Sequence, residues 1–332
     1  MRVFRPLVQA GAPRPPGAVP LAGGPLWFTH AEDMRRAQPP VLVPARDLPE
    51  DVLERLCAAR PPMAGMRFDR PRLMGILNVT PDSFSDGGAH HDPSDALRAA
   101  RAMSQAGADI LDIGGESTRP GARATDAAEE IRRIRPVVAS VCAGLDTPVS
   151  IDTRKAGVAD VAIEAGAVLV NDVSAFRFDP ALAPLCAARA VPVCVMHALG
   201  APETMQRAPR YDDVVLDVYA FLAARVAALG DLGIPRHRII VDPGIGFGKT
   251  VEHNLALLRN IAVFHGLGCP ILLGVSRKGV IGTVADVPNA ADRAPGSIAV
   301  GLAALAQGVQ ILRVHDVAAT AQAMRLWQAV RE

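Results

Sequence analysis

Short apolar runs alternate with longer amphipathic stretches along the chain from residue 73 to the C-terminus. The runs are almost continuously apolar and rich in β-branched residues, which is typical of parallel strands that are covered on both faces. Eight such strands are predicted, at 73–78, 109–113, 148–152, 167–171, 191–196, 238–242, 270–275 and 310–314. The stretches between them carry apolar residues at helical spacing, for example in 94–106, 126–142, 211–229 and 251–265.

Repeated strand-then-helix units of this kind predict an α/β fold. Eight units over about 260 residues match a (β/α)8 barrel, also called a TIM barrel. Periodicity does not prove that the sheet closes, so an open, doubly wound parallel sheet is the alternative. Residues 61–332 are therefore predicted to form the barrel, and 63–72 a short hairpin over its floor.

Residues 1–60 do not share this rhythm and are predicted to be an N-terminal extension of unknown role. Short elements are expected at 24–37 and 40–44, and a helix is expected from Asp47 to Ala59. Five prolines before residue 21 interrupt the continuous apolar core that a secretory signal would need. Arginines without an acidic residue before Glu32 leave an organellar transit peptide as an alternative to a cytoplasmic location.

The composition narrows the class of protein. Half of the 332 residues are apolar, which excludes a disordered chain, and no apolar run has the roughly 20 residues that span a bilayer. A net charge of +1 gives no overall positive potential that would attract nucleic acid or an anionic membrane surface. The five cysteines are odd in number and form no C-x-x-C pair, so reduced thiols in the cytoplasm are expected.

Only three of the 35 basic residues are lysines, at positions 155, 249 and 278. An ammonium is a compact charge with donors that rotate, whereas a guanidinium is a rigid fork, so a chain that otherwise uses arginine has reason to keep these three. Lys155 and Lys249 begin predicted helices and are expected to be structural. Lys278 is the one predicted to contact a ligand.

Each predicted strand is followed by polar residues at its C-terminal end, and in barrels that end carries the active site. Helix capping explains one or two such positions but not eight. Because strand side chains alternate between faces, Asp112, Asp152, Asn171 and Asp242 are predicted to converge on one pocket. Buried carboxylates need partners. A ring edge with several N–H donors, as in an aminopyrimidinone, would supply them, and Lys278 would neutralise part of the charge.

A second group is cationic and lies at the expected rim: Asn78, Arg119, Arg313 and His315. Such donors suit phosphate oxygens. An acidic pocket next to an anion-binding group predicts that the ligand is a flat heterocycle that carries a phosphate or diphosphate. Met196 is expected to line the barrel, where it can touch the ligand.

Three long motifs carry a family resemblance: LMGILNVTPDSFSDGG at 73–88, DIGGESTRPG at 112–121 and DPGIGFGK at 242–249. Shorter matches follow in order at 150–153, 171–174, 196–197, 276–278 and 313–316. Together they resemble the dihydropteroate synthase family. The resemblance implies a barrel, commonly a homodimer, that condenses 6-hydroxymethyl-7,8-dihydropterin diphosphate with p-aminobenzoate, with assistance from Mg²⁺.

The resemblance also implies residue roles. The pterin would be held by Asp112, Asp152, Asn171, Asp242 and Lys278. The diphosphate would be held by Arg119, Arg313, His315 and Asn78, with Asn78 near Mg²⁺. The p-aminobenzoate site would be shaped by Phe84, Thr118, Arg119, Pro120, Phe247 and Ser276. Asp112, Asp152, Lys278 and Arg119 are the expected catalytic residues, and 79–91 and 114–125 the loops that close over the substrates.

Two alternatives stay open at this stage. One is a pterin-binding barrel of the corrinoid methyltransferase kind, which would not need the diphosphate grip of Arg119, Arg313 and His315. The other is a non-catalytic pterin-binding homologue, which would not need chemically competent residues at every position of the pocket.

Overall fold

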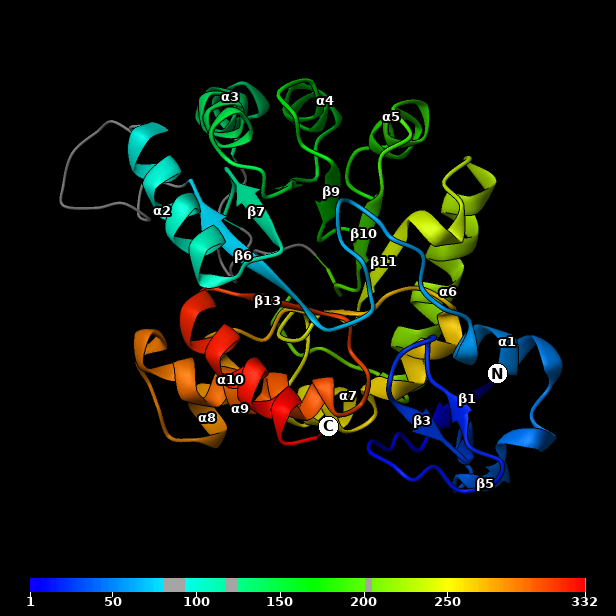
Figure 1. Ribbon diagram of the computed structural model, residues 1–332. Helices are drawn as coiled ribbons and strands as arrows, with labels where there is room; N and C mark the ends of the chain where they lie inside the picture. The colour runs from blue at the N-terminus through cyan, green and yellow to red at the C-terminus, as the bar shows by residue number, and fades with distance from the viewer. Residues whose placement is uncertain (80–92, 118–124, 201–204, 332) are drawn as a thin grey trace.

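The computed structural model describes residues 1–79, 93–117, 125–200 and 205–331, and Figure 1 shows their arrangement. Eight parallel strands form its central sheet. They are β6 (Arg72–Asn78), β7 (Ile110–Gly114), β8 (Val149–Asp152), β9 (Leu169–Asp172), β10 (Val193–Met196), β11 (Ile239–Asp242), β12 (Leu272–Leu273) and β13 (Ile311–Val314). Each overlaps a strand that the apolar runs predict.

The sheet closes on itself. Its strand order is β11-β10-β9-β8-β7-β6-β13-β12. A parallel bridge between Val241 and Ile271 joins the two ends, and the Val241 amide donates to the Pro270 carbonyl at 3.0 Å. The (β/α)8 barrel is therefore confirmed, and the open, doubly wound sheet is excluded.

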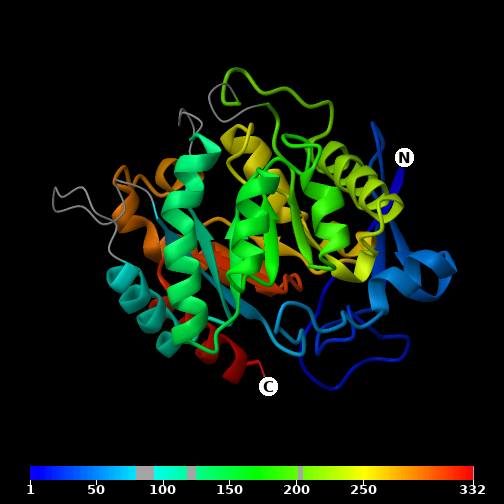
Figure 2. The ribbon, with the colours of Figure 1, turned by 90° about the horizontal axis from the view of Figure 1, so that it is seen from above.

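Helices surround the barrel, as Figures 1 and 2 show from two directions. The α-helices are α2 (Pro93–Ala106), α3 (Ala127–Gly144), α4 (Ala156–Glu164), α5 (Leu182–Ala188), α6 (Val214–Asp231), α7 (Val251–Arg259), α8 (Gly279–Val284), α9 (Ala294–Leu305) and α10 (Val317–Ala329). The 3₁₀ segments are η2 (Arg236–Arg238), η3 (Ile261–Leu267) and η4 (Ala290–Arg293). The helix predicted over 251–265 is thus divided, because Asn260 leaves helical geometry with φ of −113°. Within the described ranges, no helix is long and apolar enough to cross a membrane.

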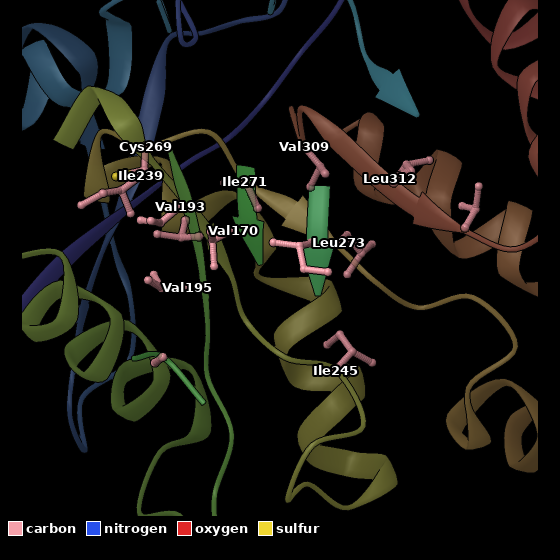
Figure 3. Packing of buried hydrophobic residues seen from close by; sticks show 14 of the residues in the cluster. Val170, Val193, Val195, Ile239, Ile245, Cys269, Ile271, Leu273, Val309 and Leu312 are labelled. Carbon is pink, nitrogen blue, oxygen red and sulfur yellow. The ribbon is translucent and has the colours of Figure 1, made fainter. Parts of the chain in front are cut away.

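Alternation along the strands separates two apolar layers. One face of each strand packs outward against the helices, and Figure 3 shows part of this layer around Val170, Val193 and Ile239. The other face fills the barrel interior with Met74, Ile110, Leu169, Cys194, Ile240, Leu272 and Ile311. Met63 and Met66 form an antiparallel bridge and pack against this inner cluster, so the hairpin predicted over 63–72 is limited to a tight turn at 63–66.

The first 57 residues form elements with their own apolar cluster. The strands are β1 (Arg2–Pro6), β2 (Val19–Pro20), β3 (Trp27–Phe28), β4 (His30–Arg35) and β5 (Val41–Pro44), followed by η1 (Ala45–Asp47) and α1 (Glu50–Cys57). β1, β4 and β5 pair antiparallel in the order β1-β4-β5. β1 and α1 lie against η3 of the barrel, where the Arg55 Nε donates to the Gly266 carbonyl at 3.0 Å.

Candidate active site

Polar side chains from several strands meet directly above the apolar barrel interior. Arg313 of β13 donates through Nε to Asp112 Oδ2 at 2.6 Å and through Nη2 to Asp152 Oδ2 at 2.7 Å. Asn171 of β9 donates through Nδ2 to the same Asp112 oxygen at 3.0 Å. A Cβ placed on Gly274 would lie 3.7 Å from Asp242 Oδ2 and 3.9 Å from Arg313 Cβ, so Asp242 faces the same space.

Register and alternation account for this convergence. Asp112, Asp152, Asn171, Asp242 and Arg313 each come two residues after an inward position of their strand, so their side chains point to the inside of the barrel near the C-terminal ends of the strands. The register opposes Asp152 to Asn171 and Met196 to Asp242. The carboxylates therefore form a ring across the barrel mouth.

Burial raises the free-energy cost of ionising the carboxyl groups of this ring. It raises the pKa of Asp152 to about 7, an effect that the Arg313 guanidinium opposes and the Asp112 carboxylate increases. Burial also raises the pKa of Asp242, against the charge of Lys278. Among the described residues, the buried Asp112 Oδ1 has no hydrogen-bond partner. A ligand with N–H donors would satisfy this acceptor and lower the cost of the buried acids.

Lys278 borders the ring from the start of α8. Its Nζ donates to the Ile245 carbonyl and lies 4.6 Å from the centroid of the Phe247 ring. Burial lowers the pKa of this ammonium to about 8, although Asp242 favours its charged form. Lys278 and Phe247 are thus brought together with Asp242, as the sequence predicts for one pocket.

Ser276 and His315 lie together beside this group. Ser276 Oγ is 3.0 Å from His315 Nδ1 and accepts from the His315 amide at 3.2 Å. Met196 ends β10 and is almost completely buried. Asn78 ends β6, and its Oδ1 is 3.8 Å from the position of a Cβ on Gly114.

Arg313 lies among the acids, whereas the sequence placed it in a separate cationic group at the rim. Four of the predicted site residues, Phe84, Thr118, Arg119 and Pro120, lie outside the described residues. The roles assigned to all of these side chains stay predictions.

Comparison with known proteins supports the interpretation of this pocket. A sequence profile of the family described as "Pterin binding enzyme" matches residues 74–315. Dihydropteroate synthase of Escherichia coli K12 is 44% identical over 262 residues, which cover 79% of this chain and 92% of that protein. The enzyme of Neisseria meningitidis serogroup B is 46% identical over 268 residues, covering 79% and 94%. The chain belongs to the dihydropteroate synthase family. It is therefore an enzyme.

Solved dihydropteroate synthases share the fold as well. The Xanthomonas albilineans protein with 4-aminobenzoic acid superposes with a TM-score of 0.76 at 46% identity, covering 80% of this chain and 94% of that one. The same species' protein in complex with 7,8-dihydropteroate gives 0.73 at 43% identity, covering 80% and 95%. About a fifth of this chain thus lies outside the matched region, and residues 1–73 precede the family match.

Sequence reasoning assigned Lys249 only a structural role and overlooked how closely it supports the site of this synthase. Lys249 is buried, and its Nζ donates to the carbonyls of Gly244 at 2.8 Å and Phe247 at 3.0 Å. The same Nζ is 2.9 Å from His197 Nδ1. Burial lowers the pKa of His197 to about 3, so its ring is neutral and accepts this bond. The rarity of lysine was the available signal.

The sequence also gives no sign of a buried ionic cluster that lies just after the C-terminal ends of β7 and β8. Glu116 accepts from Arg154 at 3.1 Å, lies 3.2 Å from Lys155 Nζ and accepts from the Thr125 amide at 2.8 Å. Lys155 Nζ also donates to Glu130 at 2.5 Å. Lys155 therefore has the structural role that the sequence predicts, and the cluster ties α3 to the segment after β8.

Replacing Gly244 by alanine is expected to destabilise the protein by more than about 2 kcal/mol. Gly244 has φ of +68°, and a Cβ there would lie 1.9 Å from the His197 carbonyl oxygen. Gly157→Ala in α4 is the control, because a Cβ there meets nothing within 4 Å and alanine favours a helix by up to about 1 kcal/mol. Urea unfolding measures both variants, and equal stabilities would contradict the argument.

Proposed function

We propose that this chain transfers the 7,8-dihydropterin-6-ylmethyl group from its diphosphate to p-aminobenzoate, which releases diphosphate and gives 7,8-dihydropteroate. The observation that carries the proposal is the buried acid ring, in which Asp112 Oδ1 has no hydrogen-bond partner among the described residues. The family of the chain supports it, as do the ligands named for its relatives, 4-aminobenzoic acid and 7,8-dihydropteroate.

The acids and their partners provide complementary contacts for the pterin. Its ring N–H and amino groups donate to the carboxylates of Asp112, Asp152 and Asp242, and its acceptors take donors from Asn171 and Lys278. The bound pterin replaces water around the buried acids, and the hydrogen bonds that it donates offset the free-energy cost of their desolvation. A ligand without those N–H groups would leave the acids unpaired, which gives the pocket its specificity.

The reaction needs electrostatic stabilisation rather than a protein nucleophile. As the C–O bond to the diphosphate breaks, negative charge grows on the leaving group, and Arg119, Arg313 and His315 are the hydrogen-bond donors proposed to stabilise it. Positive charge grows on the pterin methylene, beside the carboxylates of Asp112 and Asp152. The p-aminobenzoate nitrogen then forms the new C–N bond and loses one proton, which the diphosphate or solvent takes up.

The residues present suit a Mg²⁺ ion that is bound jointly by a protein oxygen and by the substrate's diphosphate. The described residues contain no group of three His, Cys, Asp or Glu that could hold a metal by themselves. Mg²⁺ is commonly bound by one or two protein oxygens together with substrate phosphates, and the amide oxygen of Asn78 at the end of β6 would be one such ligand. When bound, the ion would neutralise charge on the diphosphate.

The proposal also includes a homodimer in the cytoplasm. The five thiols form no disulfide, which suits a reducing compartment. Exposed apolar side chains offer surface for a second copy: Val284 of α8, Leu326 of α10 and Val330 directly after α10. Sedimentation velocity measures the assembly, and deletion of residues 1–60 followed by the same measurement and an activity assay tests what the extension contributes.

The deciding experiment incubates the purified chain with dihydropterin diphosphate, Mg²⁺ and p-aminobenzoate. Diphosphate release that depends on the amine, together with dihydropteroate identified by mass, is the expected result. No release despite tight pterin binding would indicate a non-catalytic homologue. Methyl transfer from a methylated folate to a corrinoid, without diphosphate chemistry, would indicate the other alternative.

A further inference from the structure

An arginine-rich pocket lies where the N-terminal extension meets the barrel. Its volume is about 230 Å³, and it is lined by α1, α6, η2 and η3 through Arg55, Tyr219, Ala223, Val226, Ala227, Arg236, Gly266 and Leu267. η2 comes immediately before β11, so the pocket is at the N-terminal end of the strands. The candidate active site is at the opposite, C-terminal end. Figure 1 shows α1 close to α6 at this junction.

Positive charge exceeds negative charge around this pocket. Arg55 pairs with Asp51 at 2.8 Å, and its Nε donates to the Gly266 carbonyl. The Arg236 side chain is exposed and forms no hydrogen bond or ion pair with any residue in the described ranges. The guanidinium of Arg60 is buried behind them, and its hydrogen bonds go to backbone carbonyls. Of these three guanidinium groups, Arg55 is the one that pairs with a carboxylate within the described ranges.

The two lining arginines are held close together by the backbone. Gly268 has φ of +73°, and a Cβ placed on it would lie 3.1 Å from Arg236 Cδ and 3.4 Å from Arg55 Cγ. Both side chains therefore pass over the same glycine. The two side chains carry like charges over one short stretch of backbone, and an anion bound to both guanidinium groups would be attracted by each.

We propose that this pocket binds a small organic carboxylate that bridges the extension and the barrel. Its oxygens would accept from the guanidinium groups of Arg55 and Arg236, because the arginine fork matches a carboxylate. The hydroxyl of Tyr219 lies on the same wall. The apolar part of the ligand would pack against Val226 and Leu267, which also line the pocket. The volume is below the roughly 300 Å³ of typical ligand sites, so the ligand is small.

Arg55 connects the site to the N-terminal extension. It precedes the family match at 74–315, whereas Tyr219 and Arg236 lie within it. A ligand held by both parts stabilises the state in which the extension is attached to the barrel, since it binds only that state. The pocket is therefore a site through which a metabolite of this class strengthens the contact between α1 and η3.

Titration of the full-length chain with sodium benzoate at low salt tests the proposal by calorimetry. Arg236→Gln is expected to weaken binding at least about tenfold, because a charge-assisted bond is lost while no internal contact is broken. Arg259→Gln is the matched control, an exposed arginine on α7 that does not line this pocket. An aromatic acid can also enter the candidate active site, so the difference between the two variants isolates the pocket.

Equal benzoate binding by Arg236→Gln and the wild-type chain would overturn the proposal. Inorganic phosphate is expected to bind at least tenfold more weakly than benzoate, and equal affinity would overturn the assignment to an organic carboxylate. Arg236→Glu supplies a second readout. Its carboxylate can pair with Arg55, so the variant is expected to melt at a higher temperature than the wild type and to gain no further stability from benzoate. A lower melting temperature would count against the proposal.

Discussion

Replacing Arg313 by methionine is expected to lower kcat at least about a hundredfold, because an electrostatic donor of the site is lost. The change is also expected to cost about 3 to 5 kcal/mol of folding stability. Arg313 contacts Asp112 at 2.6 Å and Asp152 at 2.7 Å, and both carboxylates are buried. Without the guanidinium, two like charges remain in a space with little water. The expected response is that one of them keeps a proton.

The stability loss should depend on pH in a definite direction. The pKa of Asp152 in the folded chain, about 7, is above its ordinary value of 3.8, so the unfolded chain releases this proton first. Stability therefore falls as the pH rises between those two values. Removing Arg313 raises the folded-state pKa further, so Arg313→Met should lose more stability at pH 8 than at pH 5. Urea unfolding at the two pH values measures this difference.

Arg313→Lys is the control for charge alone. Its ammonium restores a positive charge but lacks the fork that reaches two carboxylates from separate nitrogens. Intermediate stability and a substantial remaining loss of kcat are expected. Wild-type turnover in Arg313→Met would remove this residue from the proposed mechanism.

The fold could be predicted from sequence where local patterns and long-range packing agree. The parallel strands are apolar on both faces, so each leaves a clear run, and once the sheet closes between β11 and β12 their order around the barrel is their order along the chain. β1 was not predicted, because its partner is β4 and the pairing of Arg2 with Arg35 depends on contacts far apart in sequence. Closure through Val241 and Ile271 is likewise invisible to periodicity.

The candidate site was predictable to the level of strand and face. Alternation was enough to place Asp112, Asp152 and Asn171 in one space, since parallel strands align their ends. The partner of each acid was not predictable. The sequence places Arg313 at the rim, but a long side chain that points inward can reach acids two and three strands away. The contacts of Lys249 with the loop after β11 could not be predicted, because its acceptors are backbone carbonyls, which no residue pattern reveals.

Replacing Lys278 by alanine is expected to lower kcat/KM for the pterin substrate at least about a hundredfold. The ammonium lies over the Phe247 ring and donates to the Ile245 carbonyl, so it is fixed beside Asp242 before substrate arrives. Its removal leaves the Asp242 carboxylate without this compensating charge and takes a donor from the pterin. Steady-state kinetics with the dihydropterin diphosphate varied at saturating p-aminobenzoate measures the loss.

The pH profile gives a sharper test of the same residue. Burial lowers the pKa of Lys278 to about 8, and kcat/KM reports groups of the free enzyme, so activity should fall as the pH rises above 8. Lys278→Arg keeps its charge at that pH, so any activity it retains should lack this fall. Because the chain has three lysines, isotopic labelling of lysine should give three side-chain signals in NMR spectra, and Lys278→Ala identifies one of them. Two results together would contradict this expectation: a Lys278 signal that titrates near 10.5, and a pH profile of Lys278→Arg that equals the wild-type profile. They would show that the ammonium is not held in a buried position beside Asp242.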